Sequence, residues 1–201
     1  MERVLTARGA ATRARIIKGA VELMRRHGPA NVGLDDIRAA TATSKSQLFH
    51  YFPDGKSDLL LAVAAYEAEQ VLADQQPMLG DLTDWARWEA WRDRVVERYR
   101  TQGRNCALTA LTAQLGLSDP ATRTVINGMY ATWRGFLADG VRALAAAGQT
   151  APGADPDRIA TTLLTAISGG ATMLQATDDI RYLETALSDV LETFRPPRQD
   201  G

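Results

Sequence analysis

The sequence predicts an all-α protein of about nine helices, with short helices at the amino end and longer ones behind them. Three observations support this fold class. Alanine and leucine are abundant, runs of β-branched residues are few, and no alternation of apolar and polar residues persists. Apolar residues instead recur at intervals of three and four, as on one side of an amphipathic helix.

Size and composition indicate a protein with a substantial core in a reducing compartment. The chain has 201 residues, of which 45% are apolar. The longest unbroken apolar run, which starts at Leu59, is too short to cross a bilayer, and the amino end lacks the apolar region of a signal peptide. A single cysteine cannot form an internal disulfide. We therefore expect a cytoplasmic protein without a membrane partner.

The charges are distributed unevenly along the chain. Residues 1–60 carry ten Lys or Arg against six Asp or Glu, a balance of +4, whereas residues 61–201 carry thirteen against eighteen, a balance of −5. A basic amino-terminal segment on an otherwise acidic protein suggests that a polyanion binds there. A solvated helix surface would give the same pattern.

The predicted helices at the amino end have recognisable stops and starts. An amphipathic helix at 12–27 ends where Gly28 can adopt a left-handed cap and Pro29 cannot continue the helix. A short helix at 34–40 has two aspartates at the positive end of its dipole. Another begins after Ser44, and a long one follows with polar residues at its start.

The rest of the chain also predicts helices. They are expected at about 55–76, 84–101, a shorter stretch between 105 and 117, 120–147, 157–177 and 179–194. Glycines and prolines in 148–156 mark the clearest linker. We predict a helix-turn-helix domain at 1–54, a larger helical domain at 55–195 and a tail at 196–201.

Residues 34–52, "LDDIRAATATSKSQLFHYF", predict two helices joined by a turn. Ser44 and Gln47 form a Ser-x-x-Gln capping box, and Leu48 and Phe52 share a side that faces Ile37. The first turn then presents polar side chains, as does the recognition helix of a helix-turn-helix in the major groove of DNA. Lysine can donate to guanine and glutamine can bond adenine.

Residues 12–63 resemble the DNA-binding domain of the tetracycline-repressor (TetR/AcrR) family. The resemblance rests on the Arg-x-x-Ile start, Gly28, Ile37, Ser44, the Leu-Phe-His-Tyr-Phe run and Lys56. It implies DNA contacts from Lys45, Ser46, Gln47, Phe49, His50, Tyr51 and Lys56. Three residues depart from the family pattern: Ala42 replaces a glycine in the turn, Arg38 replaces a small residue, and Phe49 stands where tyrosine is common.

Several of these residues have another reading. Gln47 can cap the helix or contact a base, and the two uses compete for one side chain. His50 fits a phosphate contact or a structural hydrogen bond. Lys45 and Lys56 need only imprecise geometry to reach phosphates. Arg8 and Arg13 fit a contact to the minor groove or a phosphate, or a solvated position, and we favour the solvated one.

The last two predicted helices carry an apolar seam at steps of three and four residues. In the family the equivalent helices pair with their copies, so the resemblance implies a homodimer that binds a palindromic operator. The same seam would also fit an ordinary core. The residues expected at the dimer interface are Ile159, Leu163, Ile167, Leu183, Leu187 and Val190.

All four tryptophans lie between the predicted DNA-binding helices and the last two predicted helices. Large rings and methionines suit a cavity for a small apolar or aromatic ligand, although plain packing would use the same residues. The expected ligand-binding residues are Trp85, Trp88, Cys106, Met129, Trp133 and Met173. The back part of the chain, from "NCALTALTAQLG" to "SGGATMLQAT" (residues 105–177), is also similar to the LmrA/YxaF-like branch of multidrug-type regulators.

No motif of an enzyme, a metal site or a cofactor site is found in the sequence. There are two histidines, no HExxH, no cysteine cluster, no P-loop and no G-x-G-x-x-G after a strand. We therefore expect a ligand-responsive transcriptional repressor and not an enzyme, with no cofactor. The alternative is a ligand-independent regulator with a packed core, controlled by a protein partner or by abundance.

Overall fold

The protein is helical throughout the part of the chain that the structure describes. The computed structural model describes residues 5–103 and 119–197, and these ranges contain helices and no strand. The predicted all-α class is therefore confirmed. The predicted short helix between 105 and 117 lies outside the described residues. The elements are α1 (Ala7–His27), η1 (Pro29–Asn31), α2 (Leu34–Ala40), α3 (Lys45–Tyr51), α4 (Lys56–Ala73), η2 (Met78–Gly80), α5 (Trp85–Gln102), α7 (Pro120–Ala146), α8 (Pro156–Thr177) and α9 (Arg181–Phe194).

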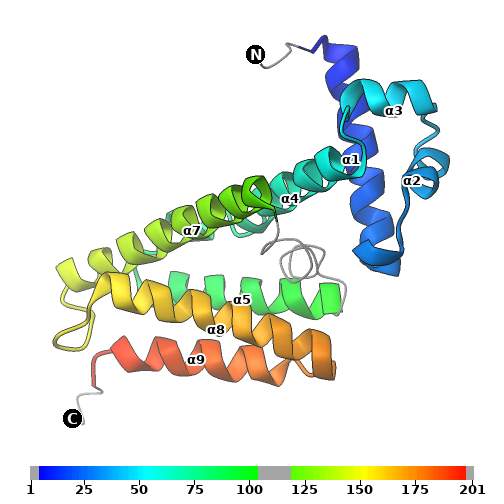
Figure 1. Ribbon diagram of the computed structural model, residues 1–201. Coiled ribbons are helices and arrows are strands. Elements are labelled where there is room, and N and C mark those ends of the chain that lie inside the picture. Colours follow the sequence, from blue (N-terminus) through cyan, green and yellow to red (C-terminus); the bar gives the residue numbers. More distant parts are fainter. Residues whose placement is uncertain (1–4, 104–118, 198–201) are drawn as a thin grey trace.

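The helices form two groups that α4 connects. The helices α1, α2 and α3 make a small group at one end, and α4 runs from this group along α7 into the larger one (Figure 1). In the larger group α7, α8 and α9 lie in succession, and α5 lies behind α8 and packs on α9 (Figure 1). The molecule is thus elongated along α4 and α7.

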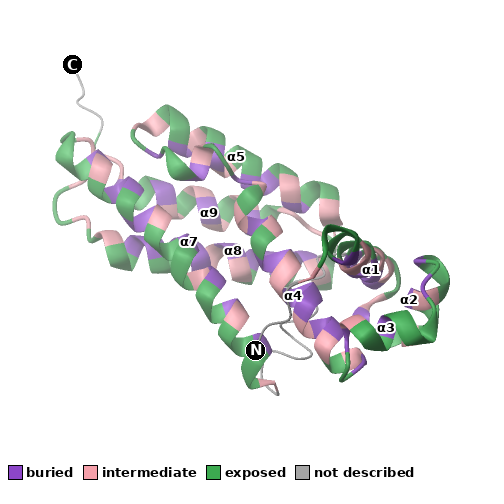
Figure 2. Cartoon of the chain, turned by 90° about the horizontal axis from the view of Figure 1, so that it is seen from above, coloured by how far each residue is buried: buried purple, intermediate pink, exposed green. Residues whose placement is uncertain are grey.

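Each group has its own hydrophobic core, and α4 contributes to both. Its first turns place Leu59 and Val63 in the small core with Ile16 and Leu48. Its later turns place Val71 in the larger core. Buried positions lie along the inward sides of the helices, while their outward sides are exposed (Figure 2). The start of α4 therefore belongs structurally to the small group.

Most predicted boundaries agree with the structure to within two residues. The largest difference is at the start of α1, which begins at Ala7 and not at residue 12. The cause is Thr6, whose hydroxyl accepts a hydrogen bond from the Gly9 N–H at 3.2 Å and so caps the extra turn. The long helix α4 ends at Ala73, three residues before its predicted end.

The apolar seam of α8 and α9 lies inside the single chain. Five of the six residues predicted at a dimer interface are buried in the chain's own larger core, and Val190 is half-buried against it. The seam faces α5, α7 and the neighbouring helix of the same chain, so these side chains are not available to a second copy. The five buried residues are Ile159, Leu163, Ile167, Leu183 and Leu187.

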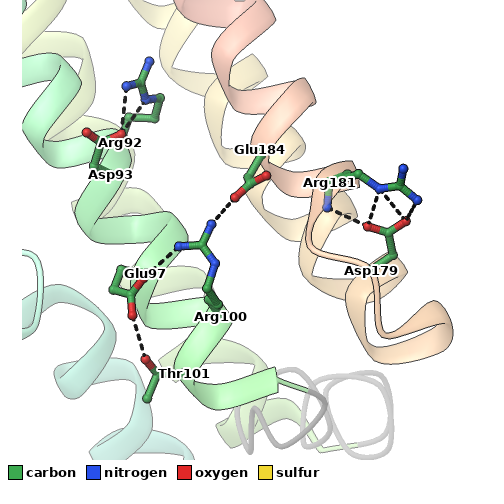
Figure 3. Close-up of polar contacts among 8 residues, drawn as sticks. All are labelled: Arg92, Asp93, Glu97, Arg100, Thr101, Asp179, Arg181 and Glu184. Carbon is green, nitrogen blue, oxygen red and sulfur yellow. Dashed lines mark hydrogen bonds and ion pairs between the residues drawn. The ribbon is translucent and has the colours of Figure 1, made fainter.

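Ion pairs at the surface tie α5 to α9 near the outer edge of the larger group. Arg100 of α5 pairs with Glu97 of its own helix at 2.8 Å and with Glu184 of α9 (Figure 3). The hydrogen bond with Glu97, supported by the charge of Glu184, raises the pKa of Arg100. At the start of α9, hydrogen bonds from Arg181 lower the pKa of Asp179 (Figure 3). These shifts belong to structural pairs at helix ends.

By length and composition, α8 is long and apolar enough to cross a membrane. The sequence analysis did not indicate this, because it considered only unbroken apolar runs. Its 22 residues do not form one apolar surface, because one side lies in the larger core and the other carries threonines, glycine and alanine. A core helix of a soluble protein passes the same test. The packing of α8 against α7 and α9 fits that reading.

Gly170 provides a test of this packing, because α8 and α9 approach each other closely there. A Cβ at Gly170 would lie 2.6 Å from the Leu183 Cα, a backbone atom that cannot turn aside. We expect Gly170→Ala to lower the free energy of unfolding by about 2 kcal/mol through overpacking, measured by urea denaturation. A Cβ at Gly135 meets nothing within 4 Å, so Gly135→Ala should raise it by up to about 1 kcal/mol. Equal effects would contradict the close approach.

Candidate nucleic-acid interface

The turn between α2 and α3 is fixed by two buried threonines. Thr41 Oγ1 donates to the Ile37 carbonyl at 2.6 Å and lies 2.9 Å from Thr43 Oγ1. The Thr41 side chain packs so closely on Gly19 of α1 that a Cβ at that position would collide with it. The close packing of the turn on α1 therefore depends on a glycine that sequence reasoning missed.

Ala42 adopts a left-handed backbone conformation in this turn, with φ at 46°. An L-residue with a Cβ is disfavoured there by roughly 1–2 kcal/mol, whereas glycine is not. The replacement of the usual glycine by alanine thus leaves the turn geometry intact at some expense in stability. The surrounding threonine bonds hold the strained residue in place.

The capping box at the start of α3 forms as predicted. The Gln47 N–H donates to Ser44 Oγ at 3.1 Å, and the Ser44 N–H donates to Gln47 Oε1 at 3.2 Å. The cap uses the amide oxygen of Gln47 and leaves its NH₂ group as a donor. Gln47 is exposed, so capping and a single hydrogen bond to a base are compatible.

The predicted cations stand clear of the protein's acidic groups. Lys45 and Ser46 are exposed on the first turn of α3, and Lys56 is half-exposed at the first turn of α4. No ion pair of Lys45 or Lys56 is found among the described residues. Both ammonium groups are therefore available to phosphates.

The three aromatic residues of α3 occupy different environments. Phe49 is an exposed large apolar residue and lies over Gly55, where a Cβ would be 3.4 Å from its Cε1. His50 is exposed and meets the Tyr51 ring edge-on at 4.9 Å. The Tyr51 hydroxyl lies beside Gly9 in the first turn of α1, so a tyrosine predicted to face DNA is half-buried between helices.

A buried ion pair joins the small group to α4. Arg25 Nη2 near the end of α1 donates to both carboxylate oxygens of Glu67, at 2.8 and 3.0 Å. The Glu67 side chain is 1% exposed. A carboxylate so deeply buried requires its partner, so this pair fixes how α1 sits on α4. The sequence held a signal for it, since Glu67 continues the buried stripe of Leu59 and Val63 at four-residue spacing.

The predicted ligand-binding tryptophans of α5 are held in a packed aromatic cluster. The Trp85 Nε1 donates to the Gln149 carbonyl at 2.9 Å, and the Arg195 guanidinium lies 4.3 Å from the Trp85 ring centroid. Trp88 is fully buried and meets the Phe194 ring edge-on at 5.5 Å. A Cβ at Gly140 of α7 would lie 2.9 Å from the Trp88 ring, so the packing here is close.

The other predicted ligand residues do not converge on one described pocket. Met129 and Trp133 are buried one turn apart on α7, whereas Met173 is exposed on the outside of α8. Cys106 lies outside the described residues. The indole N–H groups of Trp88 and Trp133 are buried and have no hydrogen-bond partner in the described part of the chain.

A groove of about 630 Å³ runs along the outer surface between α7 and α8. Tyr130 and Ser168 meet across it at 3.1 Å, and Arg134 lies on its α7 side. None of the five predicted ligand residues that the structure describes lines this groove. The sequence analysis missed it because the residues along it are mostly small and polar.

A small helix-turn-helix with a polar, exposed first turn, carried by a larger helical domain, is the architecture of a DNA-binding transcriptional regulator. Residues 16–63 match the family model described as bacterial regulatory proteins, tetR family. Residues 85–190, more than half of the chain, match the tetracyclin repressor-like C-terminal domain. The chain belongs to the TetR family of transcriptional regulators. Members of this family are homodimers that bind DNA and small-molecule effectors.

Individual relatives agree with this assignment. Transcriptional regulator AcuR of Cereibacter sphaeroides is 29% identical over 149 residues, which cover 72% of this chain and 68% of AcuR. The crystal structure of regulatory protein TetR from Rhodobacter sphaeroides has a TM-score of 0.78 at 21% identity and covers 91% of this chain and 98% of that one. A transcriptional regulator from Saccharomonospora viridis, solved in complex with choline, has a TM-score of 0.74 at 22% identity and covers 94% and 100%. The structural likenesses show the shared fold.

The ion pair of Arg25 and Glu67 can be used to test how α1 is held on α4. Glu67→Gln keeps the shape of the side chain but leaves the Arg25 charge without its partner. We expect it to lower the free energy of unfolding by about 2 kcal/mol, since Arg25 is partly exposed, as measured by urea denaturation. The exposed pair of Glu22 and Arg26 is the control, and Arg26→Ala should cost less than about 1 kcal/mol. A Glu67→Gln variant as stable as the native protein would contradict the role of this pair.

Proposed function

We propose that the protein is a dimeric transcriptional repressor that binds a palindromic operator and is released from it by a small ligand. The observation that carries the proposal is the exposed first turn of α3. Lys45, Ser46 and Gln47 project from a helix fixed by its own capping box. A polar turn with a rigid base suits insertion into the major groove. Such a regulator acts in the cytoplasm.

A second copy is needed because one helix of seven residues reads few base pairs. The outward side of α8 supports a dimer. Residues 159–177 carry no charged side chain, although about half of them are not buried. The hydroxyls of Thr161, Thr165 and Thr172 donate to carbonyls of their own helix and present methyl groups outward. An uncharged surface of this length suits burial against a partner helix. This side of α8, and not its buried seam, is the proposed subunit contact.

The effector is proposed to be small and largely apolar or aromatic, with hydrogen-bond acceptors. The indole N–H groups of Trp88 and Trp133 have no hydrogen-bond partner within the described ranges, and a buried donor without a partner costs roughly 1–3 kcal/mol. This supports an effector that carries hydrogen-bond acceptors. Trp88 of α5 packs against Gly140 of α7, and Trp133 belongs to α7 and is buried in the same larger core. The relative solved with choline is a fold neighbour that holds a small molecule. Two points stay predictions: that the chain is similar to the LmrA/YxaF-like branch, and that Cys106 contributes to ligand binding.

The release mechanism is a population shift. The two reading helices bind DNA when they are one helical turn apart, and the ligand favours a different spacing. Typical couplings of about 1–3 kcal/mol would lower operator affinity by roughly 5- to 150-fold. The lever is α4, because it belongs to both cores and is tied to α1 through Glu67.

One observation favours the alternative of a regulator without a ligand. The contact of Gly140 with Trp88 and Leu82 leaves no room for a Cβ, which is typical of a filled core. Such a protein would be controlled by a partner protein or by its abundance. The two functions differ in whether any small molecule changes DNA binding.

Selection of bound sequences from random duplex DNA tests the proposal. We expect the enriched sequences to be palindromic. When the selection is repeated with a panel of small molecules, one compound should abolish the enrichment of the palindrome. Lys56→Ala should weaken binding to all sequences and lower the slope of log K against log salt by about 1. Failure of the native chain to enrich any sequence would contradict DNA reading, and a palindrome that no compound disperses would favour the ligand-independent alternative.

Gln47 needs two variants, because it both caps α3 and faces outward. Gln47→Glu keeps the capping box but replaces the outward NH₂ donor by a carboxylate oxygen. We expect Gln47→Glu to change the preference at one base position of each half-site with little change in thermal stability. Gln47→Ala should lose both the preference and about 1 kcal/mol of stability. If only Gln47→Ala has an effect, and only on stability, the residue is a cap alone.

The subunit contact is tested by a charge on the outward side of α8. Thr165→Arg should give a monomer in sedimentation experiments, because two copies would bury like charges near a twofold axis. Its affinity for the selected palindrome should fall on the order of 100-fold through lost avidity. Ala90→Arg, on an exposed position of α5, is the control and should remain dimeric. A dimeric Thr165→Arg variant would exclude this surface.

A further inference from the structure

Arg38 is the single cation of α2, and it lies next to the turn that leads into the recognition helix. Its Nη1 donates to Asp35 Oδ1 at 2.6 Å, one turn earlier on the same helix. Both residues line a surface depression of about 380 Å³ whose other walls are Ala39, Ala42 and Thr43. Thr43 directly precedes the cap of α3, so the pair is a neighbour of the first turn of α3.

Asp35 is open to solvent and Arg38 is partly so, with its Nε buried and without a hydrogen-bond partner among the described residues, and the pair does little to hold the fold together. The Asp35 side chain is 91% exposed and that of Arg38 is 32% exposed, and exposed pairs at this spacing contribute little to stability. The hydrogen bond to Asp35 is the only side-chain hydrogen bond found for Arg38 within the described residues, and its backbone carbonyl accepts from the Thr43 N–H at 3.0 Å. Ala39 beside it is exposed and short, so it would not keep a duplex at a distance.

We infer that Asp35 and Arg38 form a second base-reading site, specific for a G·C pair in the major groove. The chemistry of the pair matches that base pair. Guanine presents the acceptors O6 and N7, which suit the guanidinium, and cytosine presents the N4 amino group, which suits the carboxylate. The site would add a base contact from α2 to those of the first turn of α3.

A base edge fits this pair better than a phosphate does. A phosphate beside Arg38 would also lie close to the exposed negative charge of Asp35, and the two anions would repel each other. A G·C edge is neutral and offers both signs of partner. The carboxylate also holds the planar fork of the guanidinium in one direction, which base reading requires and phosphate binding does not.

This inference rests on the proposed DNA-binding function, and one experiment separates the two. Random duplex DNA is selected with the native chain, with Arg38→Ala and with Arg38→Lys. The native consensus should contain a G·C position in each half-site that Arg38→Ala no longer prefers. Affinity of Arg38→Ala for the native consensus should fall on the order of 10- to 100-fold with an unchanged salt slope. Arg38→Lys keeps the charge without the fork, so it should not restore the preference.

The control is Arg26→Ala, which opens a comparable exposed pair with Glu22 at the far end of α1 from α3 (Figure 1). It should leave the consensus unchanged. An Arg38→Ala consensus identical to the native one overturns the inference. So does a uniform loss of affinity with a lower salt slope, which would make Arg38 a phosphate contact. A native chain that enriches no sequence would sink the proposed function itself and this inference with it.

Discussion

The structure depends on α4 being one unbroken helix that is buried in two cores. A single stripe at four-residue spacing runs along it, with Leu59 and Val63 in the small core and Val71 in the larger one. Between them the stripe holds Glu67, whose buried charge ties α4 to Arg25 of α1. Because packed cores resist continuous deformation, a shift of α4 in one core must be transmitted to the other. The reading helices and the interior of the larger domain therefore cannot move independently.

The sequence predicted the local features well, since each is encoded within a few residues. The capping box of Ser44 and Gln47 and the stop of α1 at Gly28 are complete within four positions of the chain, and both are present. The extra turn of α1 had a signal of the same kind in Thr6, which was overlooked. Glu67 was not singled out, because its partner Arg25 lies 42 positions away and the pair forms only in the folded chain.

Features that depend on which surfaces meet could not be predicted from periodicity. The seam of Leu163, Ile167 and Leu187 has the spacing of a buried stripe, but spacing does not say whether the covering helix belongs to the same chain. The absence of charge on the opposite side of α8 is the more informative signal. The tryptophans pose the same difficulty, because their composition suits either a pocket or a core. Only the folded structure reveals that the Trp85 N–H has a hydrogen-bond partner and that the Trp88 N–H has none in the part of the chain described.

The energetics of DNA reading explain why so small a domain needs help from elsewhere in the molecule. Each good base contact discriminates by about 1–3 kcal/mol, and α3 has seven residues, one of which is partly occupied as a cap. One such helix cannot separate an operator from the very many competing sites of a genome. A dimer with a twofold axis doubles the discrimination free energy without any new residue. A base contact from α2 adds to the discrimination at each half-site. Arg38 looked like a defect when compared with the family pattern. On the folded helix it is a charged group beside the turn that leads into α3, oriented by its pair with the exposed Asp35.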